Sequence, residues 1–535
     1  MINILKQAEK DLREAAGLKT EEDHPIEIST LETKTHLVEE LKTKDNEFVF
    51  AIFNKETGEL ENESASDYKI DNLIFIPSQD DIFTKNLIKL PSKVNFVTED
   101  VLNQAIRDVV SAYYWLDEKT YFLGISYAKY TWIHDLYWTV PFYGPWGAMG
   151  TGKTRHIDTI GALCRKPLSV SGAISEAFMY RIMDKHAPTL IINEFDRMNS
   201  DDKSLLTAIL NNAYEKNHPI PKMEGEGKNM KTKLWNVFGP KIFATLDRFK
   251  SDALESRTIR INAQEFPKEN RNDYPIELSE DFFEWVKEIH NMLIGYRFKY
   301  FASHLQDKKR VQATLEKEGD SQKLRLMRVC ELDILEGGER RKTFLDVSDF
   351  DSRTRQTFYP LLRVIKDNEI DDFIKYAKEY QEELIQQRSQ DTIGIIVNTI
   401  LSYIEVNKLS YSINSNDPQY VPVKEIRLAI SKELYGETEN EITKESKPLK
   451  EISPQYMGSL LRKLKIKTEK RGHDNNKYLV LDNKIIDFLK KRYFPSPPRS
   501  QEGDSQTRIE ADIASLNKKH AQGIPASEHA EDSQI

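Results

Sequence analysis

The stretch Gly147-Ala-Met-Gly-Thr-Gly-Lys-Thr154 constrains this chain more than any other part of its sequence. It fits G-x-x-x-x-G-K-[ST], the pattern of a loop that wraps a chain of phosphates. Glycines let such a loop curl until its backbone N–H groups face the phosphate oxygens. Lys153 is predicted to reach the β- and γ-phosphates of ATP, and Thr154 to hold Mg²⁺. The predicted nucleotide-binding residues of the loop are Gly147, Gly150, Thr151, Gly152, Lys153 and Thr154.

The segments around this loop predict an α/β core. A short strand is expected at 139–143 before the loop, and a helix at 152–164 after it. Further strands are predicted at 167–170, 189–192, 241–245 and 258–262, and helices at 174–186 and 203–217. Strands that alternate with helices favour a parallel sheet with helices on both faces.

A second part of the site is predicted where the apolar run Leu190–Ile192 ends in Asn193-Glu194. An ATPase with a phosphate loop needs one polar group near Mg²⁺ and a base for the attacking water. Glu194 is the candidate base. Asn193 is neutral, so its hold on the Mg²⁺ shell is expected to be weak, and Asp196 is a candidate to compensate. The alternative is an ordinary carboxylate at a strand end.

Two later residues are also candidates for the chemistry. Thr245 ends a predicted strand and is placed to sense the γ-phosphate. Arg257 precedes another strand, where an arginine finger could reach the ATP of a neighbouring subunit. A surface arginine that pairs with Glu255 or Asp252 is an equally good interpretation of Arg257.

Composition limits the remaining function classes. The 77 lysines and arginines against 86 aspartates and glutamates give a formal charge of −9, so any nucleic-acid surface must be a local patch. The two cysteines argue against a disulfide framework and favour a reducing cytoplasm. No apolar run approaches the ~20 residues of a membrane helix, so no membrane partner is expected.

The pattern along the chain predicts five parts. They are a β-rich accessory region at 1–96, a nucleotide-binding core at 97–270, a helical lid or connector at 271–390, a winged helix at 391–495, and a disordered tail at 496–535.

The nucleotide-site motifs in this order resemble the AAA+-type ATPase domains of phage and plasmid replication proteins, which are associated with primase–helicase polypeptides. The resemblance covers about 98–264, on the loop, Pro188–Asp196, Phe238–Thr245 and Leu254–Arg257. It implies a P-loop NTPase fold, a homo-oligomeric ring with ATP at the subunit interfaces, Arg257 acting in trans, and movement on DNA. The family has Asp where this chain has Asn193, and often Asn where it has Thr245.

Two segments are candidates for contact with single- or double-stranded DNA. The first is a predicted hairpin at 218–235, which carries Lys222, Lys228, Lys231 and Lys233; a solvated loop is the alternative. The second is the predicted winged helix, whose basic residues include Arg462, Lys463, Lys467, Lys470 and Arg471. A winged helix that docks a protein is the alternative there.

Together these features predict an ATP-dependent DNA helicase or translocase that serves replication of a mobile element such as a plasmid or virus. One alternative is an initiator or loader that binds DNA without unwinding it. Another, favoured by Asn193, is a nucleotide-gated binding module with little turnover. Primase activity, if needed, is expected from a separate partner.

Overall fold

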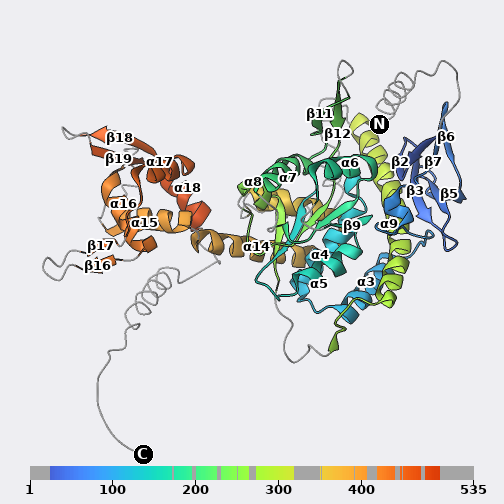
Figure 1. Ribbon diagram of the computed structural model, residues 1–535, viewed down its shortest axis with the longest axis horizontal. Coiled ribbons are helices and arrows are strands. Elements are labelled where there is room, and N and C mark those ends of the chain that lie inside the picture. The colour runs from blue at the N-terminus through green and yellow to red at the C-terminus, as the bar shows by residue number, and fades with distance from the viewer. Residues whose placement is uncertain are drawn as a thin grey trace, which may run out of the picture. The chain divides into compact units, whose positions relative to one another are not determined.

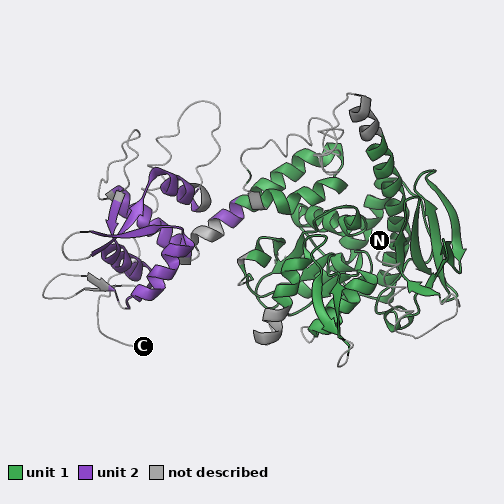
Figure 2. Ribbon diagram, turned by 90° about the horizontal axis from the view of Figure 1, so that it is seen from above, with its two compact units in different colours: residues 1–381 green, residues 382–535 purple. Residues whose placement is uncertain are grey.

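The structure is a computed structural model of the 535-residue chain. It describes residues 25–170, 174–195, 200–225, 230–249, 251–263, 273–317, 350, 352–390, 392–406, 419–435, 437–439, 446–448, 450–471 and 476–494. The predicted disordered tail, Asp196 and Lys228 lie outside these residues. The chain forms two compact units, residues 1–381 (unit 1) and 382–535 (unit 2), coloured separately in Figure 2.

Unit 1 begins with two small sheets. One has the order β1-β7-β6 and the other the order β2-β3-β4-β5. Their strands are β1 (Ile26–Ile28), β2 (Thr30–Glu32), β3 (His36–Lys42), β4 (Phe48–Asn54), β5 (Glu59–Ala65), β6 (Tyr68–Ile70) and β7 (Leu73–Pro77). The apolar runs of the sequence at 48–53 and 73–76 form β4 and β7, within the region predicted to be β-rich. β5 has no strand pattern in the sequence, because it reads Glu-Leu-Glu-Asn-Glu-Ser-Ala and lacks an apolar face.

The centre of unit 1 is a five-stranded parallel sheet with the order β14-β8-β13-β10-β9. Its strands are β8 (Phe142–Trp146), β9 (Pro167–Val170), β10 (Thr189–Ile192), β13 (Lys241–Phe243) and β14 (Thr258–Asn262). The predicted parallel sheet is therefore confirmed, and it fits the core of a P-loop NTPase. The strand predicted at 139–143 begins later, at Phe142, because the N–H of Val140 instead donates to the carbonyl of Tyr214.

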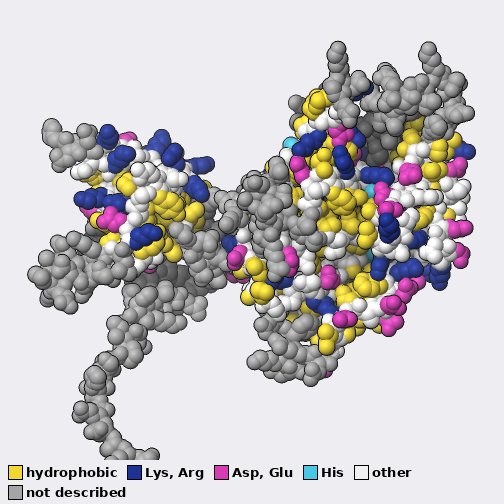
Figure 3. All heavy atoms as spheres, viewed as in Figure 1, with side chains coloured by type: hydrophobic (Ala, Val, Ile, Leu, Met, Phe, Trp, Pro, Cys, Tyr) yellow, Lys and Arg dark blue, Asp and Glu magenta, His cyan; other side chains and the backbone are white. Residues whose placement is uncertain are grey.

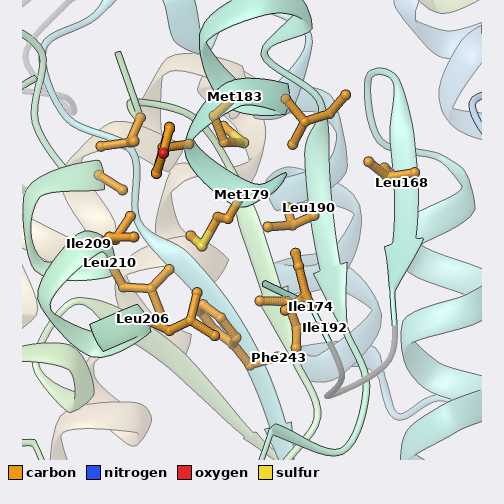
Figure 4. Packing of buried hydrophobic residues seen from close by; sticks show 14 of the residues in the cluster. Leu168, Ile174, Met179, Met183, Leu190, Ile192, Leu206, Ile209, Leu210 and Phe243 are labelled. Carbon is orange, nitrogen blue, oxygen red and sulfur yellow. The ribbon is translucent and has the colours of Figure 1, made fainter. Parts of the chain in front are cut away.

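Helices cover both faces of this sheet (Figure 1). They include α5 (Lys153–Ala162), α6 (Glu176–His186) and α7 (Ser200–Ala213). Leu190 and Ile192 point to the face of α6 and α7, where they join one apolar cluster with Met179 and Leu206 (Figure 4). Ile191 points to the opposite face, where a Cβ on Gly161 of α5 would lie 2.6 Å from its Cδ1. The glycine thus lets α5 approach the sheet closely.

Further helices surround this core. They are α2 (Asp81–Thr84), α3 (Glu99–Tyr113), α4 (Glu118–Thr131), α8 (Asp252–Glu255), α9 (Glu280–Lys317), α13 (Ser352–Phe358) and α14 (Ile370–Gln390). Of these helices, α4 was not expected from the sequence. The region predicted as a lid begins with α9, which packs along α3 and also contacts the N-terminal region, where Phe298 stacks on Phe53. A Cβ on Gly295 would lie 2.3 Å from the carbonyl oxygen of Asn95, so glycine is required at this close approach.

A buried group of charges joins the N-terminal sheet to the core. The carboxylate of Glu39 accepts hydrogen bonds from Arg165 Nη2 at 2.9 Å and from Arg297 Nε at 2.8 Å. Arg297 also binds Asp135 through both terminal nitrogens. Burial raises the pKa of Glu39, but the two guanidinium groups outweigh it and hold the pKa below its usual value. Removing one partner from such a buried group typically costs about 3–5 kcal/mol.

Unit 2 contains α15 (Thr392–Val406), α16 (Val423–Tyr435), α17 (Pro454–Lys463) and α18 (Asn483–Tyr493). Its strands are β15 (Gln419–Pro422), β16 (Glu437–Glu439), β17 (Ser446–Pro448), β18 (Lys467–Arg471) and β19 (Asn476–Leu481), and β18 and β19 form an antiparallel hairpin. The Oγ of Ser453 accepts the N–H of Tyr456, so Ser453 caps the start of α17. In the described part of the chain, no helix is long and apolar enough to cross a membrane.

Candidate nucleotide site

The predicted phosphate loop follows β8 and leads into α5. Gly147, Gly150 and Gly152 have φ values of 149°, 84° and 80°, a region that side chains disfavour. Gly152 is the N-cap residue of α5 and supplies no side-chain cap. The first N–H groups of a helix have no partner within it, and the helix dipole favours negative charge there. This combination fits the phosphate groups of a nucleotide.

Side chains of the loop stabilise its curved shape. Lys153 Nζ donates to the carbonyl oxygens of Gly147 at 2.7 Å and Ala148 at 2.5 Å. The Thr151 hydroxyl donates to the Ala148 carbonyl at 2.9 Å. The lysine ammonium therefore lies against the loop that is predicted to hold the phosphates. Thr154 is placed in the first turn of α5, next to Lys153.

The carboxyl ends of β8, β10 and β13 lie at one edge of the parallel sheet, where α/β proteins bind their ligands. Asn193 and Glu194 directly follow β10, and the Asn193 N–H donates to the Val170 carbonyl at the end of β9. Glu194 is exposed and has φ 56°, an uncommon value for a residue other than glycine. Phe195 is fully buried and anchors this turn. The loop, Asn193 and Glu194 are thus brought to the same edge.

Thr245 is also at this edge, two residues beyond β13. Its N–H donates to the Pro145 carbonyl at 3.2 Å, and its carbonyl accepts the Gly147 N–H at 3.3 Å. The predicted sensor therefore adjoins the first residue of the phosphate loop. Its hydroxyl accepts a hydrogen bond from Arg260 Nη2 at 2.7 Å. Arg260 was not among the predicted site residues. An arginine inside a buried strand is nevertheless a signal of a functional or structural partner, because arginines are rarely buried without one.

Arg257 is at the other edge of the sheet. It directly precedes β14, and its carbonyl accepts the N–H of Phe142 at the start of β8. The five residues of β14 separate the two edges by roughly 15 Å. The guanidinium donates to Asn211 Oδ1 at 3.0 Å and lies over the Tyr214 ring. The structure thus does not bring Arg257 to the phosphate loop of its own chain.

A histidine lies behind the loop. His156 Nε2 is 2.7 Å from the hydroxyl of Tyr143, and the two rings are stacked. Burial lowers the pKa of His156 to about 4, so this histidine is neutral at pH 7. Within the described ranges, no group of three or more His, Cys, Asp or Glu residues is arranged to hold a metal ion.

A cavity of about 630 Å³ opens along α5. Thr154, Arg155 and Asp158 line it from the helix, and Ser169 and Ile191 line it from the sheet. The helix face that carries the predicted Mg²⁺ ligand Thr154 therefore borders open space.

The predicted hairpin is confirmed as β11 (Ile220–Glu224) and β12 (Lys231–Trp235). Its lysines have different surroundings. Lys222 forms an ion pair with Glu176 at 2.5 Å, and Lys233 Nζ lies 3.6 Å from the centre of the Trp235 ring. Lys231 is exposed. The predicted role of these lysines in binding DNA stays a prediction.

The five basic residues predicted to contact DNA in unit 2 are all exposed: Arg462, Lys463, Lys467, Lys470 and Arg471. The first two are in the last turn of α17, and the others are on β18. Arg471 also stacks on the Tyr420 ring. Figure 3 shows Lys and Arg side chains gathered on this unit. A hairpin and a neighbouring helix therefore present a locally basic surface.

The chain is similar to a number of solved structures, two of which illustrate how low the similarity is. No protein-family model matches the sequence, and no curated protein matches it either. One solved structure, described as SCCmec type IV Cch, an active helicase, has a TM-score of 0.38 and 14% identity; the match covers 91% of this chain and 84% of the other. The apo structure of the NrS-1 C-terminal region has a TM-score of 0.32 and 12% identity; the match covers 83% of this chain and 96% of the other. Similarity at this level carries no argument about function.

Proposed function

We propose that this chain hydrolyses ATP and uses the energy to move on or remodel DNA during replication of a mobile element. The observation that carries the proposal is the assembly of the phosphate loop, Glu194 and Thr245 at one edge of the parallel sheet. A loop alone would support nucleotide binding. A carboxylate and a hydroxyl that follow neighbouring strands at the same edge add groups for hydrolysis.

Each residue has a distinct part in this proposal. Lys153 neutralises phosphate charge, and the N–H groups at the start of α5 bind phosphate oxygens. Glu194 accepts a proton from the attacking water, and Thr245 donates a hydrogen bond toward the terminal phosphate. Mg²⁺, held by Thr154 and a shell that includes Asn193 and Asp196, would supply further neutralisation of phosphate charge.

A ring of identical subunits would complete the site. Arg257 is roughly one strand length from the edge that carries the loop. An arginine so placed can serve a neighbouring subunit's ATP more readily than its own. The basic surface of unit 2 supports DNA as the partner, since exposed lysines and arginines bind phosphates without reading sequence.

Steady-state ATP hydrolysis, measured with and without single-stranded DNA, tests this proposal. The wild type is expected to hydrolyse ATP faster when DNA is present. Lys153→Ala should lose both hydrolysis and tight ATP binding, whereas Glu194→Gln should bind ATP and fail to turn it over. The matched control is Glu59→Gln, an exposed glutamate on β5. Turnover by Glu194→Gln at the wild-type rate would contradict the role of Glu194.

Two other functions remain alternatives. Asn193 specifically favours a nucleotide-gated binding module with little turnover, because a neutral amide binds the Mg²⁺ shell less strongly than a carboxylate. Such a protein would bind ATP and show a rate near background. An initiator or loader would hydrolyse ATP but would not separate strands. A strand-displacement assay with a forked DNA duplex distinguishes it from a helicase.

A further inference from the structure

Arg260 is a buried arginine at the centre of the ATPase core. It is the third residue of β14, and its side chain is 3% exposed. Its guanidinium donates through Nη2 to the Thr245 hydroxyl at 2.7 Å and to the Asp247 carbonyl at 3.0 Å. It also lies 4.8 Å from the centre of the Phe249 ring. A permanent positive charge is thus fixed beneath the start of the phosphate loop.

The reach of Arg260 depends on a glycine in the neighbouring strand. The sheet order β14-β8-β13 places β8 between Arg260 and the end of β13, where Thr245 lies. Arg260 is paired in register with Gly144 of β8. A Cβ on Gly144 would lie 2.7 Å from Arg260 Nη1 and 2.7 Å from Thr258 Cγ2, so a larger residue would crowd both the guanidinium and the Thr258 methyl. The missing side chain at Gly144 therefore opens the path across β8.

The bond from Arg260 has a chemical consequence for Thr245. A hydroxyl has one hydrogen to donate and two lone pairs to accept with. Arg260 carries no acceptor, so in their mutual bond the Thr245 oxygen must be the acceptor. The Thr245 hydrogen is then directed away from Arg260 and is available for an acceptor outside this pair. At the edge that carries the phosphate loop, a phosphate oxygen is such an acceptor.

The other side of the guanidinium faces the segment that carries Arg257. Arg260 Nε lies 3.5 Å from the carboxylate of Glu255, the last residue of α8. The same carboxylate accepts the Phe249 N–H at 3.0 Å. Glu255 is two residues before Arg257 in the chain. Arg260 thus contacts both Thr245 at one edge of the sheet and the segment before Arg257 at the other.

We propose that Arg260 is a positioning residue, which orients the Thr245 hydroxyl as a donor toward the terminal phosphate and links it to the segment that carries Arg257. This inference rests on the proposed ATPase function. The inference adds a requirement that the sequence motifs do not contain. An arginine within β14 must lie opposite a glycine within β8. A purely structural arginine would stabilise unit 1 without acting through Thr245.

A double-mutant cycle between Arg260→Met and Thr245→Val tests the inference in the full-length protein. Methionine keeps an apolar stem and removes the donors, and valine removes the hydroxyl with little change of shape. Each single change is expected to lower kcat about 100-fold, the typical cost of misplacing a group at a reacting centre. Affinity for a fluorescent ATP analogue should stay within about threefold, because the loop and Lys153 remain. The double variant should be no slower than the slower single variant, because both changes remove one interaction.

Further variants separate positioning from folding. Thr245→Ser keeps the hydroxyl and should restore most of the rate. Arg107→Met, at an exposed arginine on α3, is the matched control and should behave as wild type. If Arg260→Met fails to fold, as judged by thermal melting, Gly144→Ala replaces it in the cycle, because the added methyl crowds a guanidinium that is still present, together with the Thr258 methyl.

The outcomes are distinct. Non-additive losses of kcat with intact binding support the inference. If the kcat losses of the two single variants multiply in the double variant, the inference is overturned and the ATPase function stands. The same holds if ATP binding is lost as strongly as the rate. A folded wild type without ATP turnover would overturn the proposed function and this inference together.

Discussion

Glu40 is a carboxylic acid in the interior of the N-terminal sheet. It lies on β3 beside Glu39 and is 1% exposed. Two arginines bind the carboxylate of Glu39. The carboxyl oxygens of Glu40, in contrast, have no hydrogen bond of good geometry among the described residues. Burial raises the pKa of Glu40 to about 8; Glu27 and Glu39 raise it further, and Lys166 and the nearby Ser78 backbone partly offset the rise. Glu40 is therefore expected to be protonated in the folded protein at pH 7.

The raised pKa makes stability depend on pH with a definite sign. Between the ordinary pKa of 4.5 and a folded-state pKa of about 8, the unfolded chain releases the Glu40 proton and the folded protein keeps it. The folded state then binds more protons, so its stability falls as the pH rises. The free energy of unfolding contributed by Glu40 should fall by about 3–4 kcal/mol from pH 5 to pH 8, since each pKa unit is worth ~1.4 kcal/mol.

Glu40→Gln tests this directly, because glutamine resembles the protonated acid and does not titrate. Thermal unfolding of the wild type, Glu40→Gln and the exposed control Glu59→Gln should be compared at pH 5, 6, 7 and 8. Glu40→Gln is expected to be close to wild type at pH 5 and clearly more stable at pH 8. A wild type that is as stable as Glu40→Gln at pH 8 would refute the reasoning. It would mean that Glu40 is ionised and paired with Lys166, whose own pKa is lowered by burial to about 7.

Three further predictions concern the proposed ATPase site and the proposed DNA contacts. Asn193→Asp should raise the ATPase rate or lower the Mg²⁺ concentration for half-maximal rate; a lower rate in a folded protein would mean that the site is built around asparagine. Mixing Arg257→Ala with Glu194→Gln subunits should restore part of the activity that each lacks, because a finger in trans is worth ~10³–10⁵ in rate. Mixtures no more active than either variant would exclude a shared site. In the full-length protein, Arg462→Ala combined with Lys463→Ala should weaken duplex DNA binding in a gel-shift titration and reduce its salt dependence, because fewer counterions are released. An unchanged salt slope would assign this surface of unit 2 to another partner.

The sequence by itself determined the local features of the core. The strands predicted at 167–170, 189–192 and 258–262 coincide with β9, β10 and β14. β10 is buried at every position, and its Leu-Ile-Ile run is the continuous apolar pattern that a strand covered on both faces requires. The glycines of the phosphate loop have the positive φ values that the motif predicts. These are properties of short segments, and their residue types encode them directly.

The tertiary structure decided which residues meet, because those contacts join segments far apart in the chain. Glu39 is bound by Arg297, 258 residues away, and the polar pattern of β3 and β5 gave no sign that two glutamates of β3 are buried. Arg260 reaches Thr245 because β8 lies between β14 and β13 and has glycine at the crossing point. Strand order and the burial of a charge depend on residues that are distant in the sequence, so a short segment does not reveal them. Strand order and burial together determine where the predicted catalytic groups lie.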